Sequence, residues 1–546
     1  MKNILDQFGS IRAVIKIQTP PVYDPDTGVI IGRQLFGFDT AEAGGPADDL
    51  LAVSTKKRIE QPAGRFSLVF TPRQVWNGKT WADLIPPYSL CEIYMQRYPE
   101  NEEPVLVMVG LTDAQIESDD YQQAAPQRTR QVTGYELSVL LSDQKILYLP
   151  VPPDQRQVLL TTALFSQTPD ALGRTPSLQR NRAGEDERFL PPTASPELAA
   201  FASKDGGEKG MLAVDPKLAT EGSSPIDVID RVVRMLTVGT ETPYNHNGLP
   251  LVNFDFPDAR LRDLLFFDKG KATLFDPRAV LPPSAQITAD TNLWNLLTTF
   301  SDGVFQELFT QSVDLSLAPP ITALERALGS TDRLLETASP VAVEIVFRKK
   351  PFAGRINDKG ELVGVADPNG SQFDRSFAAS ETVAIKDAVC WNLVRNSRDQ
   401  NVTNTYLVYP RLPNYNSPLD HRAQIAPVVD ADRLNPSSVR RFGPRLLEVQ
   451  DVYLPPDLKG PLPFVELAHA REMLLWAWRR FGPLFRSGRY TIRGNTRMRV
   501  GKRGVHETRD FNREYYLEGV GQNMNFGKAP RFITTLDVER GWPLQG

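Results

Sequence analysis

The closing stretch of the chain, residues 488–542, constrains the fold most, because its side chains alternate in character along a long run. From residue 531 onward, one face carries mostly apolar side chains, namely Phe532, Thr534, Leu536 and Val538. The other face is mostly polar and carries Arg531, Ile533, Thr535, Asp537 and Glu539. A period of two is typical of a strand with one face on a core and the other in solvent. We therefore predict a half-buried strand with Leu536 inward and Thr535 outward.

A second strand is predicted just before it, at 514–520, with Tyr515 and Leu517 facing the same core. Gly519 and Gly521 lie inside this strand pattern. A glycine in such a position indicates a bulge or the close approach of another backbone segment.

Shorter extended pieces surround this pair of strands and recur at the N-terminus. Two are predicted at 490–493 and 497–500, and residues 525–530 supply the turn between the long strands. N-terminal strands are predicted at 11–18, 51–60, 65–70, 90–96, 105–111 and 131–141. Many short strands separated by turns are typical of a barrel or a sandwich.

Other segments show helical spacing or isolated strands. An apolar face with helical spacing predicts a helix over 226–239, and a second helix runs from about Thr288 to Leu308 with a weak point at Ser301–Gly303. Pro463 begins a third predicted helix, which ends before Gly482. Strands are predicted at 341–347 and 402–409, whereas 377–401 is ambiguous between helix and strand. Residues 150–225 are rich in Pro, Gln, Ser and Gly, which favours a long loop or arm.

Composition excludes several classes of protein. The chain has 45 prolines and 37 glycines among 546 residues, which favours a β-rich, loop-rich architecture over helical bundles. A net charge of −4 is not that of a general nucleic-acid binder. Cys91 and Cys390 stand alone in apolar contexts, so we expect buried thiols rather than a disulfide framework. The N-terminus is too polar for a signal peptide, and no apolar run is long enough for a membrane helix.

No motif predicts an enzyme, a cofactor site or a metal site. Residues 77–80 imitate the end of a phosphate-binding loop, but Arg73 stands where that motif requires glycine. Residues 519–521 begin like a dinucleotide fingerprint, but Met524 occupies its sixth position. His246, His421, His469 and His506 are scattered without metal-ligand spacing. We therefore predict no catalytic, cofactor-binding or metal-binding residues.

The C-terminal region is locally basic. Its basic residues are Arg489, Arg493, Arg497, Arg499, Lys502, Arg503, Arg509 and Arg513. They favour one of two interpretations: a contact to DNA or an acidic partner, or a solvated strand face.

Several segments together resemble the phage tail hub proteins of the late control protein D-like family. N-terminal segments that carry the resemblance are Gly64–Pro72, Leu84–Met95, Val105–Asp113 and Val132–Leu141. Further segments are Trp294 with Phe305, Glu307 and Phe309, then Arg348–Phe352, Tyr515–Val520, Thr534–Leu536 and Arg540-Gly541. The resemblance covers residues 11–150, 290–352 and 390–541.

The resemblance implies a β-rich α+β multidomain fold with two tail-tube-like β-barrels, helical insertions and long loops. The expected domains are a first barrel at 1–150, an arm at 151–225, a mixed middle domain at 226–376 and a discontinuous second barrel at 377–546, whose helical insertion lies near 455–482. The expected function is the structural hub of a phage tail baseplate or a related contractile injection machine. As a homotrimer, it joins the hexameric tail tube to a spike.

Expected partners are tail-tube or distal tail ring proteins, a separate spike protein and a tape measure protein, with no membrane and no nucleic acid beyond DNA in the channel. A separate spike is expected because the chain ends shortly after Gly541. The expected location is the virion tail, assembled in the host cytoplasm. Two alternatives remain open: another virion component, such as a receptor-binding or fibre-type protein, and a tail-associated cell-wall hydrolase.

Overall fold

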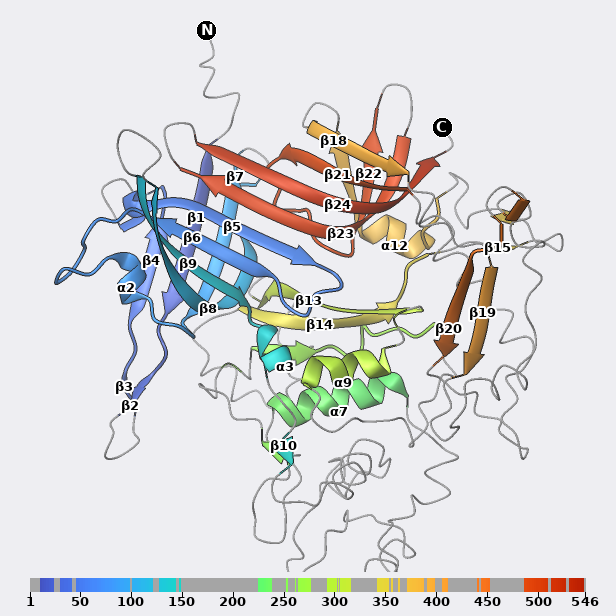
Figure 1. Ribbon diagram of the computed structural model, residues 1–546, viewed down its shortest axis with the longest axis horizontal. Coiled ribbons are helices and arrows are strands. Elements are labelled where there is room, and N and C mark those ends of the chain that lie inside the picture. The colour runs from blue at the N-terminus through green and yellow to red at the C-terminus, as the bar shows by residue number, and fades with distance from the viewer. Residues whose placement is uncertain are drawn as a thin grey trace, which may run out of the picture.

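The structure is a computed structural model of the chain (Figure 1). It describes residues 10–23, 30–41, 46–98, 101–120, 127–143, 147–148, 224–237, 252–253, 261, 264–275, 292–301, 303, 305–315, 341–352, 355–356, 362–363, 371–386, 390–397, 405–410, 439–440, 443–451, 486–508, 512–526 and 530–544. Predictions outside these ranges include the arm at 150–225, apart from its last two residues, and the helix that begins at Pro463. The environments of His246, His421, His469 and Arg509 also lie outside them. No helix among the described residues is long and apolar enough to cross a membrane.

The N-terminal strands form one half of a large sheet and are antiparallel to one another, in the order β5-β6-β9-β8-β7-β1-β4. Their bounds are β1 Ile11–Gln18, β4 Leu35–Asp39, β5 Leu50–Arg58, β6 Arg65–Phe70, β7 Leu90–Arg97, β8 Val105–Asp120 and β9 Gln127–Glu136. This half, which we call the N-terminal block, folds over on itself. Strands β1, β4 and β7 share a core with β5 and β6 that includes Ile15, Phe38, Val53, Phe66 and Ile93. The fold-over resembles a barrel, although β4 and β5 are not hydrogen-bonded to each other.

The prediction for the end of this block was partly wrong. Residues 131–141 were expected to form a single strand, but β9 ends at Glu136 and Val139–Asp143 form the short helix α3. Leu140 and Leu141 are buried in a core that they share with helices of the middle region. Periodicity cannot separate a strand from a helix in so short an apolar run.

The C-terminal strands form the other half of the sheet, in the order β18-β21-β24-β23, with β22 also paired to β23 and β17 to β22. We call this half the C-terminal block. Its strands are β17 Thr382–Lys386, β18 Cys390–Ser397, β21 Arg486–Arg493, β22 Arg503–Glu507, β23 Asn512–Asn525 and β24 Arg531–Leu544. Leu536 is fully buried and Thr535 is exposed, as the alternation predicted. Tyr515 and Leu517 are both buried in one core, as predicted.

The strand predicted at 497–500 is absent, and a turn occupies these residues. Met498 N donates to Asn495 O at 3.3 Å, which bends the backbone, and Gly501 takes the left-handed φ of 76°. Met498 and Val500 are buried, so the alternation was correctly found. The extended conformation needs a partner strand, however, and these residues have none among the described ones.

A smaller three-stranded sheet and two helices lie beneath the large sheet (Figure 1). The sheet has the order β12-β14-β13, with β12 Leu265–Phe267, β13 Gln306–Asp314 and β14 Val341–Lys349. Helices α7 Pro225–Thr237 and α9 Leu293–Phe300 pack on it through a core with Val228, Leu297 and Ile345. The helix predicted to reach Leu308 stops at Phe300, because Ser301 ends it and Leu308 already lies in β13.

Short elements complete the described chain. They are β2 Val22–Tyr23, β3 Ile30–Gly32, η1 Pro46–Asp49, α2 Trp81–Leu84, β10 Leu147–Tyr148, β11 Val252–Asn253, β15 Arg355–Ile356, β16 Leu362–Val363, α12 Arg375–Ser380, β19 Thr405–Pro410 and β20 Leu446–Asp451. The strand predicted at 402–409 corresponds to β19, which pairs in parallel with β20. The ambiguous segment before it resolves into α12, β17 and the edge strand β18.

The two blocks are joined into one sheet. Strand β23 pairs antiparallel with β5, from Gly519 opposite Arg58 to Asn525 opposite Ala52. The large sheet is therefore continuous across segments separated by more than four hundred residues of sequence. The β-rich expectation is confirmed in this form. The described strands do not close into two hydrogen-bonded barrels, so that finer prediction stays open.

Candidate functional site

The junction between β23 and β5 is the place where the two blocks meet, and its glycines fit the sequence prediction. The pairing of β23 with β24 shifts register between Leu517 and Gly519, which is the predicted bulge. A Cβ atom on Gly521 would lie 2.5 Å from Thr535 Oγ1, so β24 approaches β23 too closely there for a larger side chain. A Cβ atom on Gly519 would lie 3.1 Å from Asp537 Oδ2. The two glycines therefore allow β23 and β24 to pack closely at the junction.

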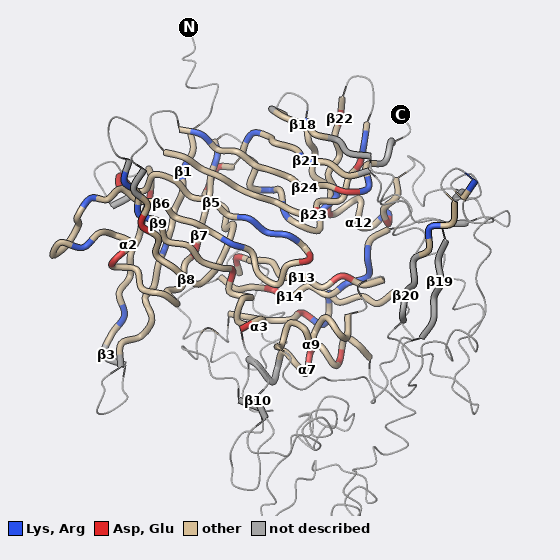
Figure 2. Tube along the Cα trace, viewed as in Figure 1, with Lys and Arg blue, Asp and Glu red and all other residues tan. Residues whose placement is uncertain are grey.

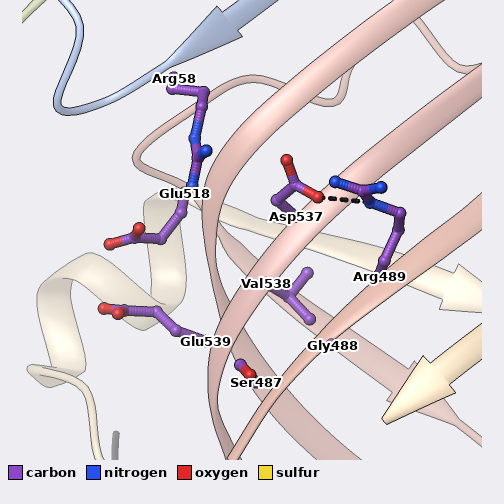
Figure 3. A pocket seen from close by; sticks show the side chains of 8 residues that line it. All are labelled: Arg58, Ser487, Gly488, Arg489, Glu518, Asp537, Val538 and Glu539. Carbon is purple, nitrogen blue, oxygen red and sulfur yellow. Dashed lines mark hydrogen bonds and ion pairs between the residues drawn. The ribbon is translucent and has the colours of Figure 1, made fainter. Parts of the chain in front are cut away.

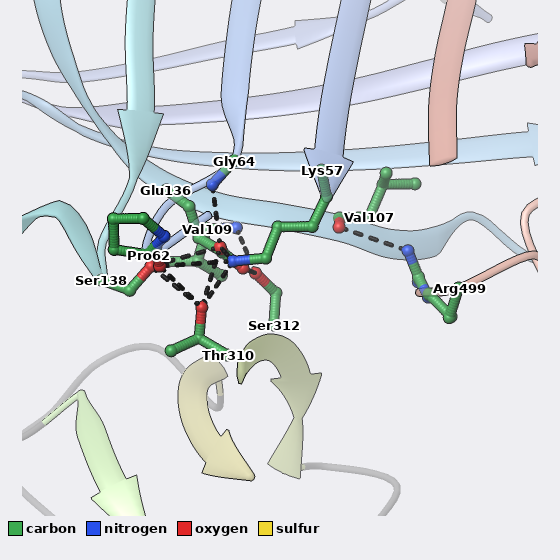
Figure 4. A network of polar contacts seen from close by, with 10 residues as sticks. All are labelled: Lys57, Pro62, Gly64, Val107, Val109, Glu136, Ser138, Thr310, Ser312 and Arg499. Atoms are coloured by element: carbon green, nitrogen blue, oxygen red, sulfur yellow. Dashed lines mark hydrogen bonds and ion pairs between the residues drawn. The ribbon is translucent and has the colours of Figure 1, made fainter. Parts of the chain in front are cut away.

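A buried polar network anchors the N-terminal block to the middle sheet (Figure 4). Lys57 on β5 forms an ion pair with Glu136 at the end of β9, and both side chains are almost completely buried. Glu136 also accepts from Gly64 N at 3.1 Å and lies 3.2 Å from the Thr310 hydroxyl. Ser312 Oγ lies 3.3 Å from Glu136 Oε1 and accepts from Val109 N at 2.9 Å.

The network satisfies two charges that would otherwise be costly to bury. Burial lowers the pKa of Lys57, and the attraction of Glu136 opposes this effect. The contacts join β5, β9 and β13, so they fix the position of the middle sheet under the N-terminal block.

A second buried network anchors the C-terminal block to the same middle hairpin. Arg348 Nε on β14 donates to Glu307 Oε1 at 2.5 Å, and Tyr516 on β23 donates to the other oxygen of Glu307. Arg348 Nη2 also donates to Gly501 O at 2.6 Å. Burial, followed by the nearby Glu307 carboxylate, raises the pKa of the Tyr516 hydroxyl well above its ordinary value. Strands β13 and β14 thus contact both blocks through buried charges.

A third network holds the segment 371–377 against the closing strands. Glu514 accepts from Arg503 Nε at 2.8 Å, from Gln372 N at 2.6 Å and from the Ser371 hydroxyl at 2.8 Å. Burial raises the pKa of Glu514, and these hydrogen bonds oppose the rise. The Arg540 side chain is buried, and its guanidinium carbon lies 3.7 Å from the centre of the Phe352 ring.

The described basic C-terminal residues, a set that leaves out Arg509, do not form one charged surface. Arg503 points inward to Glu514, and Arg499 is partly buried, with its guanidinium donating to the carbonyls of Val107 and Leu106. Burial lowers the pKa of Arg499 to about 10, with Glu136 opposing. Arg489 pairs with Asp537 at 2.8 Å on the exposed face. Neither a continuous DNA contact nor a fully solvated strand face describes this set, because several of its members serve the core.

A shallow depression of about 320 Å³ lies on the exposed face beside the junction (Figure 3). Its side chains come from β5, β21, β23 and β24, and Arg489 and Asp537 form an ion pair on its wall. The lining residues are Arg58, Ser487, Gly488, Arg489, Glu518, Asp537, Val538 and Glu539. Most of these side chains are polar or charged, so the depression has the character of a polar contact surface.

The motifs that imitate nucleotide sites have other structures. Trp76 and Lys79 are bridged across a tight turn in which Asn77 has φ 46° and Gly78 has φ 76°. Thr80 then caps α2, with its side chain accepting from Asp83 N. Residues 519–521 lie inside β23, so no helix follows them to bind a phosphate.

The described residues contain no group of three or more His, Cys, Asp and Glu side chains that could hold a metal ion. Cys91 is buried, and burial raises the pKa of its thiol far above the ordinary value. His506 on β22 is buried, with Nδ1 lying 3.2 Å from the Tyr490 hydroxyl. Cys390 is only partly buried, so the prediction of buried thiols is confirmed for Cys91 and wrong for Cys390, which lies on the edge strand β18.

The chain was compared with known proteins at three levels. No family model matches it, and no curated protein does. Solved structures similar to the chain include the 43 kDa tail protein of prophage MuSo2 from Shewanella oneidensis, with 10% identity, a TM-score of 0.43, and coverage of 97% of this chain and 98% of that one.

A tail protein from Neisseria meningitidis MC58 is 9% identical over 96% of each chain, with a TM-score of 0.39. A component of the type VI secretion system of E. coli is 7% identical over 90% of this chain and 73% of that one, with a TM-score of 0.34. Two of these three solved structures are described as phage tail proteins and the third as a secretion-system component.

Proposed function

We propose that this chain is the central hub of a phage tail or a related contractile injection machine, where three copies join a six-fold tube to a spike. One observation carries the proposal: the large sheet contains two four-stranded antiparallel units side by side. They are β18-β21-β24-β23 from the C-terminal block and β5-β6-β9-β8 from the N-terminal block.

Two similar units in each chain give a three-fold ring six quasi-equivalent positions. Identical chains that form a closed ring use a heterologous interface, so each chain presents two different edges to its neighbours. A ring of three can match a ring of six only if each chain supplies two similar contact surfaces. Each unit, with the strands that pack beneath it, would correspond to one of the two expected barrels.

The outward face of the two units is suited to line a channel. Along β24 the outward positions include Thr535 and Asp537, and along β23 they include Asn523 and Gly521. These side chains are small or polar. Within the ring, the outward faces would form a continuous wall, and the middle sheet and helices would lie on the outside.

The buried networks supply the rigidity that such a role requires. The β13–β14 hairpin contacts the N-terminal block through Thr310 and the C-terminal block through Glu307 and Arg348. It therefore fixes the angle between the two units, which determines whether three copies close a ring. In this proposal the chain is a structural component of the virion tail, with the tube, spike and tape measure proteins as partners.

Copy number in purified tails tests the proposal. Isotope-labelled peptides from this chain and from the tube protein would be quantified in the same particles by mass spectrometry. We expect three copies of this chain per tail, independent of tail length, against tube subunits in multiples of six. Six copies, or a number that rises with tail length, would contradict the hub assignment.

A further inference from the structure

We propose that Lys56, Arg58 and Arg65 form a contact surface for the phosphate backbone of a nucleic acid. The sequence Lys56-Lys57-Arg58 lies in β5, where successive side chains point to opposite faces. Lys57 points inward to Glu136, so Lys56 and Arg58 point outward. Figure 2 shows this basic run along β5 beside the junction of the two blocks.

Arg65 adds a third cation to the same face. It lies directly opposite Lys56 in the pairing of β5 with β6, and both side chains are exposed. The guanidinium of Arg65 lies over the Tyr135 ring, 5.2 Å from its centre. Like charges directly opposite each other on paired strands destabilise a sheet, so this arrangement opposes folding and favours the binding of an anion.

Several other basic residues on the exposed surface have carboxylate partners, whereas these three cations have none among the described residues. Arg489 pairs with Asp537, and Arg12 pairs with Asp39. No described carboxylate forms an ion pair with Lys56, Arg58 or Arg65. Glu518 lines the depression beside Arg58 (Figure 3), but no ion pair joins the two.

The surroundings of these cations favour a nucleic acid over an acidic protein. Neighbouring outward positions on the paired strands are small, with Gly519 and Gly521 on β23 and Ser67 on β6. On the side of Arg58, the carboxylates of Glu518, Asp537 and Glu539 line the depression, so the anion contact is centred on Lys56 and Arg65. None of the exposed large apolar residues in the described chain lies on β5, β6 or β23. Protein interfaces are enriched in aromatic side chains and depleted in lysine and serine, whereas phosphate contacts use Arg, Lys, Ser and Thr.

The expected contact is electrostatic and independent of base sequence. The protein's net charge of −4 keeps the overall affinity low, so the contact suits a polymer that passes over the surface without being held. In the proposed ring this face lines the channel. The binding test uses the purified full chain and does not depend on copy number, so its failure and a failure of the hub assignment can be told apart.

The test measures binding of a fluorescent duplex DNA by anisotropy over a range of salt concentrations. A triple variant, K56Q/R58Q/R65Q, removes the three cations. The control, R12Q/K16Q/R73Q, removes the same charge from cations that have partners in Asp39, Glu92 and Asp49. Thermal melting confirms that both variants fold.

We expect K56Q/R58Q/R65Q to weaken binding about tenfold or more at low salt and to reduce the slope of log affinity against log salt by about 2 to 3. The control should change the affinity by less than about threefold, because its cations are already neutralised by carboxylates. Equal losses in the two variants would show a net-charge effect and overturn the proposal. Absence of binding by the unmodified chain, or equal binding of polyglutamate through the same residues, would also overturn it.

Discussion

The two faces of the large sheet at its junction use charged residues in opposite ways. On the inner face, Lys57 has a dedicated partner in Glu136, and in the middle sheet that packs beneath this face Arg348 has one in Glu307. On the outer face, Lys56 and Arg58 lie one residue away from Lys57 and have no ion pair with any described carboxylate. The inner charges fix how the blocks are held together, whereas the outer charges are available for contact with another molecule.

This difference follows from the cost of burying a charge. A buried ion needs a partner and hydrogen bonds, and each lost contact leaves an uncompensated charge in a region of low dielectric constant. An exposed ion is solvated and needs no partner. The same residue type on one strand therefore has a structural role when it points inward and a binding role when it points outward.

The largest expected effect comes from removing one inner charge. Lys57→Met should reduce the free energy of unfolding by about 3–5 kcal/mol, because Glu136 remains buried without its cation. The double variant K57M/E136Q should recover part of this loss, because it removes both charges while leaving an acceptor for Gly64 N. Denaturant unfolding measures both. A loss for Lys56→Met as large as that for Lys57→Met would break the comparison between the two faces.

A nonpolar pair on the closing strand tests the same difference between faces. Leu536→Ala should cost roughly 2–5 kcal/mol, as for other buried leucines, because Leu536 is fully buried. Thr535→Ala, on the exposed face, should cost far less. Both can be compared in thermal melts. Similar losses for the two would refute the register of β24.

A partly exposed pair should give an intermediate and pH-dependent effect. The hydrogen bond from Arg12 lowers the pKa of Asp39 below its ordinary value, with burial opposing. A lowered carboxyl pKa adds stability above the unfolded-state value of about 3.9, and this stability is lost as the pH falls through the folded-state pKa. Arg12 and Asp39 side chains are 37% and 18% exposed, so screening keeps the effect below about 1 kcal/mol.

Denaturant unfolding at a series of pH values measures this effect. The stability difference between the unmodified protein and Asp39→Asn should be greatest near neutral pH and should shrink as the pH falls below about 4. A difference that grows on acidification would contradict the assigned ion pair.

The smallest expected effect belongs to the outer cations. The variant K56Q/R58Q/R65Q should change stability by less than about 0.5 kcal/mol per residue, with the sign toward stabilisation. The expected stabilisation arises because Lys56 and Arg65 lie directly opposite each other on paired strands, so removing their charges relieves a repulsion. Calorimetry at low and high salt would measure this effect, because the gain in stability of the variant should shrink as salt screens the repulsion. A marked destabilisation would mean that these residues serve the fold.

The sequence predicted local features well where one segment contains the whole signal. Predicting that Leu536 points inward and Thr535 outward requires only the period of two along the strand. Predicting the bulge at Gly519 requires only a glycine within a strand pattern. The helix predicted at 226–239 was also confirmed, as α7 at Pro225–Thr237. In each case local spacing determines the result.

The candidate site could not be predicted in the same way, because it is built from distant segments. Lys57 and Glu136 are 79 residues apart, and Thr310 is a further 174 residues from Glu136. No local pattern specifies which strand pairs with β5, so the junction with β23 was missed. The helix predicted to reach Leu308 failed for a related reason: apolar spacing continues past Phe300, but the partner strand β14 makes those residues a strand.

Three-dimensional reconstruction of the assembled tail tests the central claim most directly. The claim is that one continuous sheet supplies two equivalent units from each chain to a ring around a channel. We predict three chains, with the unit β18-β21-β24-β23 and the unit β5-β6-β9-β8 at alternating positions, their outward faces toward the axis. Six chains in the ring, or one unit lying away from the axis, would contradict the account.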